Sequence, residues 1–494
     1  MKLRLLVPIV ASVLVLAWVL VAGSSVPTTA DAWHGGRCNG ERCLPIVYVH
    51  GGSGSAAQYE GPAQRWASNN YPNVVRALDR VDASIQPYNE QMDDFFDAVM
   101  AETGDDQIFV LSHSYGSLLM KDYLNSSPER SAKVAKFISL DSSSAGENPE
   151  CPGNPEPVDC IGIYRDDNPN YMGPITYRLP LHGHTQCVTS AESFAIQYEY
   201  FTGREPKTTL VVPEFPLLVT VAGRAVYFPA NTPVDGSTLQ IWEVDGDTGA
   251  RKYSFPKAVI DIGPTGEFGP VRVNGNKHYE FTLYRPDVDF LTHYYFQPFL
   301  RDDHLIRLLA TPADSPVLTY TPTGPDHAAL VVLRYFEWWA DQGDMNDTLW
   351  VTTTSPAWDD DPVNPTPPTL NVLSNPLVAP SAGWKLGIHA HDIGPYPSPL
   401  PFPDPPDKVS TLGLIKLFNL MPFQTGVDIW MPTTEPPDGT ITFMNEPRGD
   451  TTLTQTINIP NWASEDHRVL VQFNTYFQDI NSWWEYILYR LFGD

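Results

Sequence analysis

A serine, an aspartate and a histidine among the first 190 residues occur in settings that suit nucleophilic catalysis. Ser114 lies in "VLSHSYGSLL", where an apolar run, a sharp turn and a helical pattern follow one another. A serine at such a strand-to-helix turn, flanked by small residues, holds its hydroxyl above the sheet, where it can attack a carbonyl carbon. Ser112 stands in place of the usual first glycine, and a serine can also simply begin a helix. Ser114 therefore needs partners before it predicts chemistry.

Two residues further along the chain provide the acid and the base. Asp141 directly follows "VAKFISL", a run typical of a buried strand. Open α/β sheets place their chemistry at the carboxyl ends of strands. His184 lies in the loop before the helical pattern of "CVTSAESFAIQYEYFTG". The order Ser114, Asp141, His184 is that of an α/β-hydrolase triad. The same irregular segment holds rivals for these roles, the base His182 and the acids Asp166 and Asp167.

Strand and helix patterns alternate around these residues. "PIVYV" at 45–49 is a short buried-strand pattern that ends in His50-Gly51-Gly52, and the residues from Asn73 give a second one. From Asn89, "NEQMDDFFDAVMAETG" places apolar residues at helical spacing, with a glycine at its end. This alternation predicts a mostly parallel sheet flanked by helices, and the order of Ser114, Asp141 and His184 makes it an expected α/β-hydrolase fold over residues 33–204.

The pattern changes after residue 204. Alternating strand patterns recur with turn signals such as "VDGDTGAR" and "VNGNKH", and long helical patterns nearly vanish. We predict two all-β, sandwich-like modules, at 205–312 and 313–478, the second carrying Pro-rich loops that cannot join central strands. Residues 479–494, "DINSWWEYILYRLFGD", form a short amphipathic aromatic segment that packs on a β-module or docks at a lipid surface.

Several of these segments resemble a known family. "VHGGSGSAAQYE", "NSSPERSAKVAKFISLD" and "GHTQCVTSAESFAIQYEYFTG" are similar to an archaeal type of lipase and carboxylesterase, in which an α/β-hydrolase domain precedes a β-rich lipid-binding domain. "FQPFLRDDHLIRLLATP" and "INIPNWASEDHRVLVQFN" extend the similarity far beyond the first domain. The lid of those lipases is missing here, since only "DASIQPY" connects the second strand to the helix before Ser114.

The resemblance also implies roles for individual residues. It implies Ser114 as the nucleophile, Asp141 as the acid and His184 as the base. The backbone amides of Gly52 and Tyr115 would be the oxyanion-hole donors, and this agrees with the usual placement of such donors after the nucleophile and in the turn after the first core strand.

The N-terminus is a predicted targeting segment. Lys2 and Arg4 precede an apolar run from Leu5 to Ala22. Ala30-Asp31-Ala32 then offers a cleavage site, so we predict a signal peptide at 1–32, cleavage after Ala32 and secretion. The apolar run is also long enough to serve as an uncleaved membrane anchor.

All five cysteines lie before residue 190. Cys38 and Cys43 form one close pair in the sequence, and Cys151 and Cys160 form another. In an exported chain this spacing suggests two small-loop disulfides with Cys187 left over, although other pairings remain open. Zinc is not expected, because the repeated C-x-x-C spacing is missing.

The charge of the chain limits its partners. The formal net charge is −27, so nucleic acid is not an expected partner, because phosphate binding draws on clustered Lys and Arg. Anionic membrane surfaces would be repelled for the same reason, so any lipid contact should be apolar or with neutral aggregates. The triad chemistry needs no metal or other cofactor.

Together these patterns predict a secreted serine carboxylic-ester hydrolase that forms an acyl-enzyme on Ser114 and binds lipid or substrate with the help of its β-modules. Two alternatives remain. An acyltransferase would use the same triad and pass the acyl group to an alcohol instead of water. A catalytically silent adhesion or carbohydrate-binding protein would use the β-modules alone. The sequence leaves the acyl chain length, the alcohol part of the substrate and the oligomeric state open.

Overall fold

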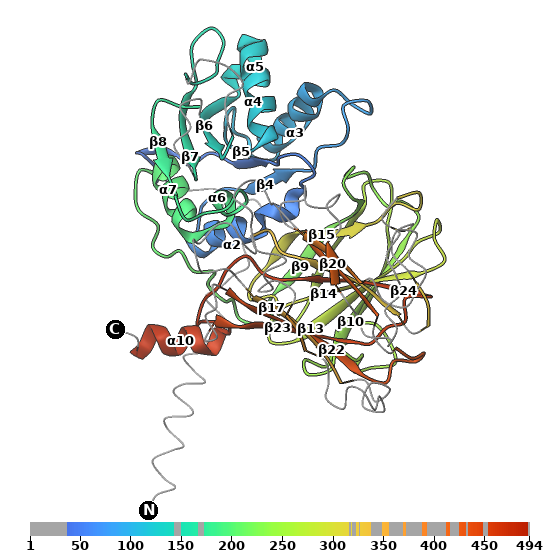
Figure 1. Cartoon of the computed structure of the whole chain (residues 1–494). Helices are drawn as coiled ribbons and strands as arrows, with labels where there is room; N and C mark the ends of the chain where they lie inside the picture. Colours follow the sequence, from blue (N-terminus) through green and yellow to red (C-terminus); the bar gives the residue numbers. More distant parts are fainter. Residues whose placement is uncertain are drawn as a thin grey trace, which may run out of the picture.

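A computed structural model describes residues 37–142, 150–165 and 172–315 without a break in each range. Beyond these it describes 318, 323–325, 327–336, 348–354, 369–371, 388–392, 412–414, 424–430, 433–447 and 453–492. The predicted signal peptide at 1–32 and the rival acids Asp166 and Asp167 lie outside the described residues. An α/β part and a β-rich part pack directly against each other (Figure 1). No helix within the described ranges is both long and apolar enough to cross a membrane.

The α/β part is built on a six-stranded sheet in the order β4-β3-β5-β6-β7-β8, in which every neighbouring pair is parallel. Its strands are β3 (Ile46–Val49), β4 (Val75–Leu78), β5 (Ile108–His113), β6 (Val134–Leu140), β7 (Asp159–Tyr164) and β8 (Thr176–Arg178). This confirms the α/β-hydrolase fold predicted from the alternating patterns.

Helices cover both faces of this sheet, which explains why a central strand such as β3 is apolar and buried at every position. Ile46 and Tyr48 of β3 belong to one core cluster, with Trp66 and Tyr198 from helices on that face. Val47 and Val49 belong to the opposite cluster, with side chains from the helices on the other face. The helical elements are η1 (Ala56–Tyr59), α2 (Glu60–Ser68), α3 (Tyr88–Thr103), α4 (Tyr115–Ser126), α5 (Pro128–Ala132), α6 (Gln186–Thr189) and α7 (Ala191–Thr202).

The β-rich part contains three sheets. A nine-stranded sheet has the order β11-β10-β13-β14-β24-β16-β21-β19-β20, a three-stranded sheet the order β12-β9-β15, and a four-stranded sheet the order β18-β17-β22-β23. The strands up to residue 312 are β9 (Thr220–Tyr227), β10 (Thr238–Val244), β11 (Ala258–Asp261), β12 (Glu267–Arg272), β13 (His278–Tyr284), β14 (Leu291–Phe296) and β15 (Asp303–Ala310). The later strands are β16 (His327–Leu333), β17 (Thr348–Thr353), β18 (Thr369–Asn371), β19 (Ile388–Asp392), β20 (Leu412–Leu414), β21 (Gln424–Trp430), β22 (Thr440–Glu446), β23 (Gln455–Pro460) and β24 (His467–Gln472).

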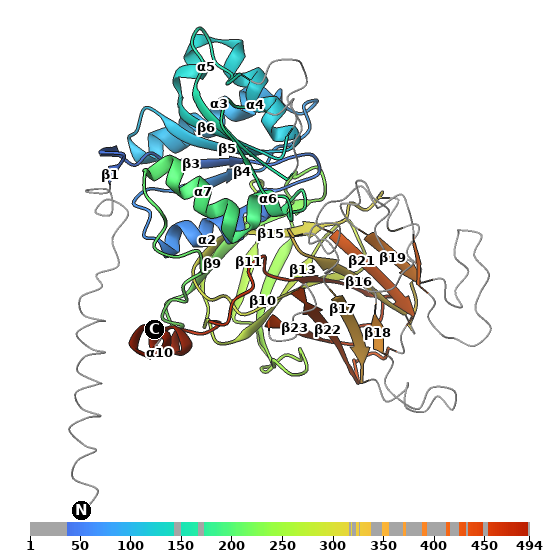
Figure 2. The same cartoon turned by 60° about the vertical axis from the view of Figure 1, so that its left-hand side comes forward.

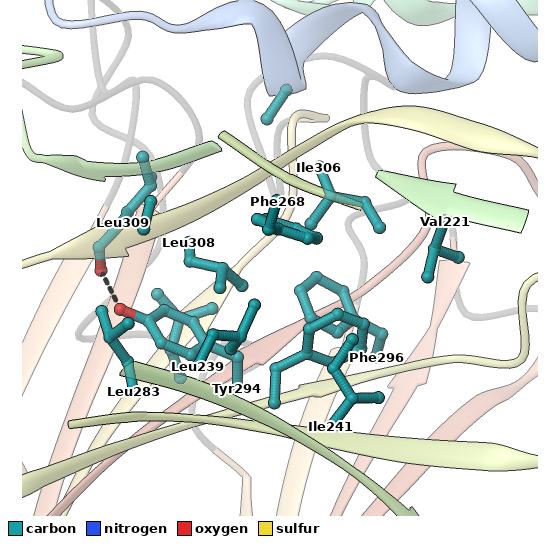
Figure 3. Close-up of a cluster of buried hydrophobic side chains, with 14 of the residues drawn as sticks. Val221, Leu239, Ile241, Phe268, Leu283, Tyr294, Phe296, Ile306, Leu308 and Leu309 are labelled. Carbon is teal, nitrogen blue, oxygen red and sulfur yellow. Dashed lines mark hydrogen bonds between the residues drawn. The ribbon is translucent and has the colours of Figure 1, made fainter. Parts of the chain in front are cut away.

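The main core of the β-rich part lies between two of these sheets. Side chains of the three-stranded sheet, such as Val221, Phe268 and Ile306, face side chains of the nine-stranded sheet, such as Ile241 and Phe296 (Figure 3). This is the face-to-face packing of a β-sandwich.

The nine-stranded sheet includes strands from both predicted β-modules. β14 pairs in parallel with β24, and β24 pairs in parallel with β16, although β14 and β24 are far apart in the sequence. The two β-rich segments therefore share one sheet, while the boundary between residues 312 and 313 stays a prediction. After β24 the chain ends in α10 (Trp483–Phe492), which lies at the periphery of the β-rich part (Figures 1 and 2).

A buried carboxylate joins the two parts. Asp79 follows β4, and its Oδ2 accepts hydrogen bonds from Arg224 of β9 at 2.8 Å and from Arg307 of β15 at 2.7 Å. Its Oδ1 accepts the backbone N–H of Ala56 at 2.8 Å. Burial alone would raise the pKa of Asp79, but the guanidinium groups of Arg307 and Arg224 outweigh it and lower that pKa. The edge of the parallel sheet is thus fixed to the β-rich part by an ionised group.

We expect Asp79→Ala to lower the free energy of unfolding by about 3–5 kcal/mol, because it leaves two guanidinium groups at the interface without their shared carboxylate. Urea titration followed by tryptophan fluorescence measures this change. The matched control is Arg76→Gln on the same edge strand, which removes the partner of the half-exposed Glu102 and should stay within about 1 kcal/mol of wild type. Similar values for the two variants would contradict a structural role for Asp79.

Candidate active site

Ser114 occupies a strained corner between β5 and α4. Its φ is 52°, in the left-handed region, and its backbone N–H bonds the carbonyl of Leu140 at 3.0 Å. A Cβ on Gly116 would lie 2.4 Å from the carbonyl oxygen of His50, and a Cβ on Gly51 would lie 2.8 Å from Cβ of Ser114. Only glycine fits at these two positions, because the turn after β3 and the corner after β5 are in direct backbone contact. The geometry is that of a nucleophile elbow.

Ser112, the residue in place of the usual elbow glycine, is accommodated by a partner. Its hydroxyl donates to Ser117 Oγ at 2.9 Å, and Ser117 Oγ donates to the Ser112 carbonyl at 2.8 Å. Both side chains are fully buried. The extra hydroxyl therefore links the end of β5 to the first turn of α4 instead of leaving a buried polar group unpaired.

Asp141 and His184 meet at the carboxyl end of the sheet. Asp141 directly follows β6 and has a φ of 41°, and its Oδ2 lies 2.5 Å from His184 Nδ1. Arg165 also contacts this carboxylate, through its backbone N–H and its guanidinium Nε, both at 3.2 Å. The contact with Asp141 holds the His184 ring through Nδ1 and leaves Nε2 as the ring nitrogen that Asp141 does not bind. Within the part of the chain that the structure describes, no hydrogen bond joins Ser114 Oγ to His184, a contact that is often loose in unliganded enzymes.

The rival base His182 does not reach this pair. His182 Nε2 lies 3.5 Å from a carboxylate oxygen of Glu192 on α7, so it faces a different acid. The structure thus brings His184, and not His182, to Asp141.

A second histidine, which the sequence analysis missed, supports His184. Gln58 Nε2 donates to His113 Nδ1 at 2.9 Å, so the proton of the His113 ring is on Nε2, which donates to the His184 carbonyl at 3.0 Å. The two imidazole rings lie 4.4 Å apart between centroids. Burial, followed by the charge of His184, lowers the pKa of His113 well below its usual value, so the His113 ring stays neutral beside His184.

The two predicted oxyanion donors lie on the turns that meet at the elbow. Gly52 is exposed in the turn after β3, and Tyr115 is the first residue of α4. Beneath the turn, His50 is fully buried, and its pKa is lowered to about 3 by burial and by the charge of Arg80. Neutral His50 therefore packs under a turn whose outer side faces solvent.

Backbone strain concentrates at this place. Six non-glycine residues in the described chain have positive φ, and four of them lie at the site or in contact with it: Ser53, Ser114, Asp141 and Asn231. Such conformations cost about 1–3 kcal/mol each and persist where surrounding contacts impose them.

The cysteines form two disulfides, Cys38–Cys43 and Cys151–Cys160, and Cys187 is buried and takes part in neither. Cys38 lies on β1 (Arg37–Cys38), which pairs with β2 (Glu41–Arg42) before the first core strand. Across the described residues, no group of three or more His, Cys, Asp or Glu side chains is arranged to hold a metal ion.

Two models of known families match segments of the β-rich part. The model of the Lipase C-terminal domain family matches residues 218–312, and a second family model, described as a C-terminal domain, matches residues 316–477. Each match covers less than half of the chain. Among curated proteins, none matches the chain.

Similar solved structures include several α/β-hydrolases and lipases. Lipase B of Aspergillus fumigatus is 14% identical, with 37% of this chain and 57% of that chain covered and a TM-score of 0.27. A gene product of Listeria innocua is 12% identical, with coverages of 34% and 96% and a TM-score of 0.25. A Bacillus licheniformis lipase in its propeptide form is 10% identical, with coverages of 84% and 92% and a TM-score of 0.24. These low identities and TM-scores carry no information about substrate.

The neutral His113 should make stability depend on pH. Its pKa in the folded chain is well below the value of about 6.5 in an unfolded chain, so only the unfolded chain takes up this proton as the pH falls below 6.5. Its contribution to stability is therefore present above about pH 6.5 and is lost on acidification. We expect the free energy of unfolding to fall more steeply for wild type than for His113→Gln between about pH 6 and 4.5, by up to about 1.4 kcal/mol per pH unit.

Urea titrations across this pH range measure the difference between the two proteins. The exposed His304, replaced by Gln in the same way, is the matched control and should follow wild type. Parallel curves for wild type and His113→Gln would contradict a lowered pKa of His113 in the folded chain.

Proposed function

We propose that this chain is a serine carboxylic-ester hydrolase of the lipase or carboxylesterase type. The observation that carries the proposal is the Asp141–His184 pair beside Ser114 at a nucleophile elbow, under a glycine turn at the carboxyl end of a parallel sheet. The match of residues 218–312 to the Lipase C-terminal domain supports the same conclusion independently of the site.

The proposed reaction has two halves. In the first, His184 Nε2 takes the proton of Ser114 as Oγ bonds the ester carbonyl carbon, and the negative charge on the former carbonyl oxygen is met by the amides of Gly52 and Tyr115. The carbon–alkoxide bond then breaks, and His184 gives its proton to the leaving alkoxide. In the second half, water loses a proton to His184, attacks the acyl-enzyme and releases the carboxylic acid with Ser114 restored. Asp141 orients the ring and stabilises the imidazolium in both halves.

Access to Ser114 supports soluble esters as substrates in addition to lipids. Residues 79–87 alone connect β4 to α3, where the resembling lipases insert a lid. Tyr115, beside the nucleophile, and Ile85 of this connection are both strongly exposed. We propose that the site is open without an interfacial rearrangement.

We also propose that the protein is secreted. Two disulfides in the α/β part suit an oxidising compartment, and the apolar N-terminal run with its small-residue cleavage site provides the route.

Neutral lipid aggregates are the proposed lipid partner, bound through an apolar surface of α10 and the loop before β9. Phe215 of this loop packs edge-on against Trp483 of α10, with ring centroids 5.2 Å apart. The exposed apolar residues of the surface are Phe215, Leu217, Leu218, Trp484, Leu488, Tyr489 and Leu491. The net charge of −27 opposes anionic bilayers, so the surface should bind uncharged lipid.

The acyltransferase alternative uses the same acyl-enzyme and differs only in the acceptor. Product analysis in the presence of a primary alcohol separates the two, because transfer gives a new ester while hydrolysis gives free acid. A catalytically silent binding protein would form no product in either assay.

Replacing Ser114 by Ala should abolish hydrolysis of p-nitrophenyl esters at every acyl chain length, because no acyl-enzyme can form without the hydroxyl. We expect a loss of about 10⁴-fold or more in kcat. The matched control is Ser126→Ala at the other end of α4, which should retain wild-type kinetics. Wild type that is folded but inactive on all chain lengths would contradict the proposed function.

Replacing Trp484, Leu488 and Leu491 together by Ser should weaken binding to a neutral triglyceride emulsion and slow its hydrolysis, while hydrolysis of a soluble short-chain ester stays unchanged. Flotation with the emulsion and titrated acid release measure the two effects. The matched control replaces another exposed aromatic pair, Tyr253 and Phe255, by Ser. Equal losses on both substrates, or equal losses in the control, would contradict the lipid-binding role of α10.

A further inference from the structure

The turn that carries Gly52 is held by contacts that the triad does not use. The Gly51 carbonyl oxygen lies 2.7 Å from His50 Nδ1 and accepts a hydrogen bond from Arg80 Nη2 at 2.8 Å. His50 Nε2 accepts the backbone N–H of Arg80 at 2.9 Å, so the proton of the neutral ring is on Nδ1 and is donated to Gly51. Two donors, one of them charged, therefore fix this carbonyl.

The direction of the Gly51 carbonyl determines the direction of the Gly52 N–H. A trans peptide is planar, so the C=O of Gly51 and the N–H of Gly52 point in opposite directions within one plane. Donors that hold the oxygen on the inner side of the turn thus aim the N–H toward the outer side, where Gly52 is exposed. Hydrogen bonds to the carbonyl also polarise the peptide and strengthen its N–H as a donor.

Arg80 is itself held in place at the edge of the site. Its Nη2 also donates to the His50 carbonyl at 3.1 Å, and its guanidinium lies 5.0 Å from the ring centroid of Tyr88 and 5.6 Å from that of Tyr115. Within the described ranges, no carboxylate forms an ion pair with Arg80. The charge of Arg80 is directed at carbonyl oxygens and at the ring of Tyr115, the residue next to Ser114.

One residue of the β-rich part forms hydrogen bonds with both the glycine turn and Arg80. Asn231, in the turn after β9, donates from Nδ2 to the carbonyl of Gly54 at 2.8 Å and to that of Arg80 at 3.0 Å, and the same atom lies 3.3 Å from His50 Nε2. Asn231 is fully buried, so these contacts are shielded from water. It thereby connects the end of the glycine turn to the strand end that supplies the Arg80 guanidinium.

Both the backbone conformation at position 231 and the contacts of its side chain favour asparagine. Asn231 has a φ of 56°, a conformation that asparagine tolerates better than most residues. Its amide supplies two N–H donors to two carbonyl oxygens, and its buried Oδ1 has no hydrogen-bond partner among the described residues. The side chain is therefore placed as a donor to the turn.

We propose that Asn231 is a positioning residue for the oxyanion donor Gly52, acting through the His50 ring, the Arg80 backbone and the Gly54 carbonyl. The inference rests on the proposed function and deepens it: the β-rich part contributes to transition-state stabilisation itself, as well as to lipid contact. Because every ester develops the same oxyanion, the effect is equal for short soluble and long apolar acyl chains.

The test uses the full chain with a soluble short-chain p-nitrophenyl ester. Asn231→Gly removes the amide and keeps the positive φ without strain. We expect kcat to fall about 10- to 100-fold with KM unchanged, and the inhibition constant of an alkylboronic acid, whose tetrahedral adduct places an oxygen in the oxyanion site, to rise by a similar factor. Asn70→Gly is the matched control, since Asn70 also has a positive φ of 54° but is exposed and remote from the turn.

Asn231→Asp is the second variant. A carboxyl group buried among carbonyl oxygens is held protonated, so it can restore one of the two donors, and we expect its kcat to lie between those of Asn231→Gly and wild type. If Asn231→Gly does not fold, Asn231→Asp becomes the test. A kcat of Asn231→Asp at least fivefold below wild type, with unchanged KM, then supports the proposal.

Three outcomes of these experiments would overturn the inference. Wild-type kcat in a folded Asn231→Gly chain, or in the Asp variant where the glycine variant does not fold, overturns the inference and leaves the proposed function intact. A rise in KM with unchanged kcat overturns it too, because a misaimed oxyanion donor acts on the transition state. A wild type that hydrolyses no ester overturns the proposed function and the inference with it.

Discussion

The contact between two backbone turns is the constraint on which the site depends. Gly116 lies so close to the carbonyl oxygens of Val49 and His50 that a side chain at this position would collide with them. This approach places the exposed Gly52 turn beside Ser114, and the two residues follow strands β3 and β5, which are neighbours in the sheet. The positive φ of Ser114 and the bond between Ser112 and Ser117 maintain the corner that makes the approach possible.

The β-rich part stabilises the same region from the other side. Asp79 at the end of the edge strand binds two arginines of the β-rich part, and one residue further along Arg80 reaches the glycine turn. Asn231 closes the connection by holding the Arg80 carbonyl. The ionic contact of Asp79 and the contact of Arg80 with the glycine turn therefore come from one short segment, so displacement of the β-rich part would disturb both.

The local patterns of the sequence predicted the parallel sheet and the positions of Ser114, Asp141 and His184, because each of these residues follows a recognisable strand or precedes a recognisable helix. The contacts of Gln58, Arg80 and Asn231 could not be predicted in this way. Asn231 lies 177 residues from Gly54 in the sequence, and no periodicity connects the two. Likewise, β14 pairs with β24, although the sequence analysis placed these two strands in separate β-modules. Non-local contacts of this kind are decided by packing, which a single sequence does not display.

Covalent labelling tests the central claim most directly. The mature protein is treated with an alkyl fluorophosphonate, and the intact mass and the labelled peptide are determined by mass spectrometry. The account predicts the addition of one phosphonyl group, located on Ser114, and no addition when Asp141 and His184 are replaced by Asn and Ala together. Labelling at another serine, or no labelling of the folded wild-type protein, would contradict the assignment of Ser114 as an activated nucleophile.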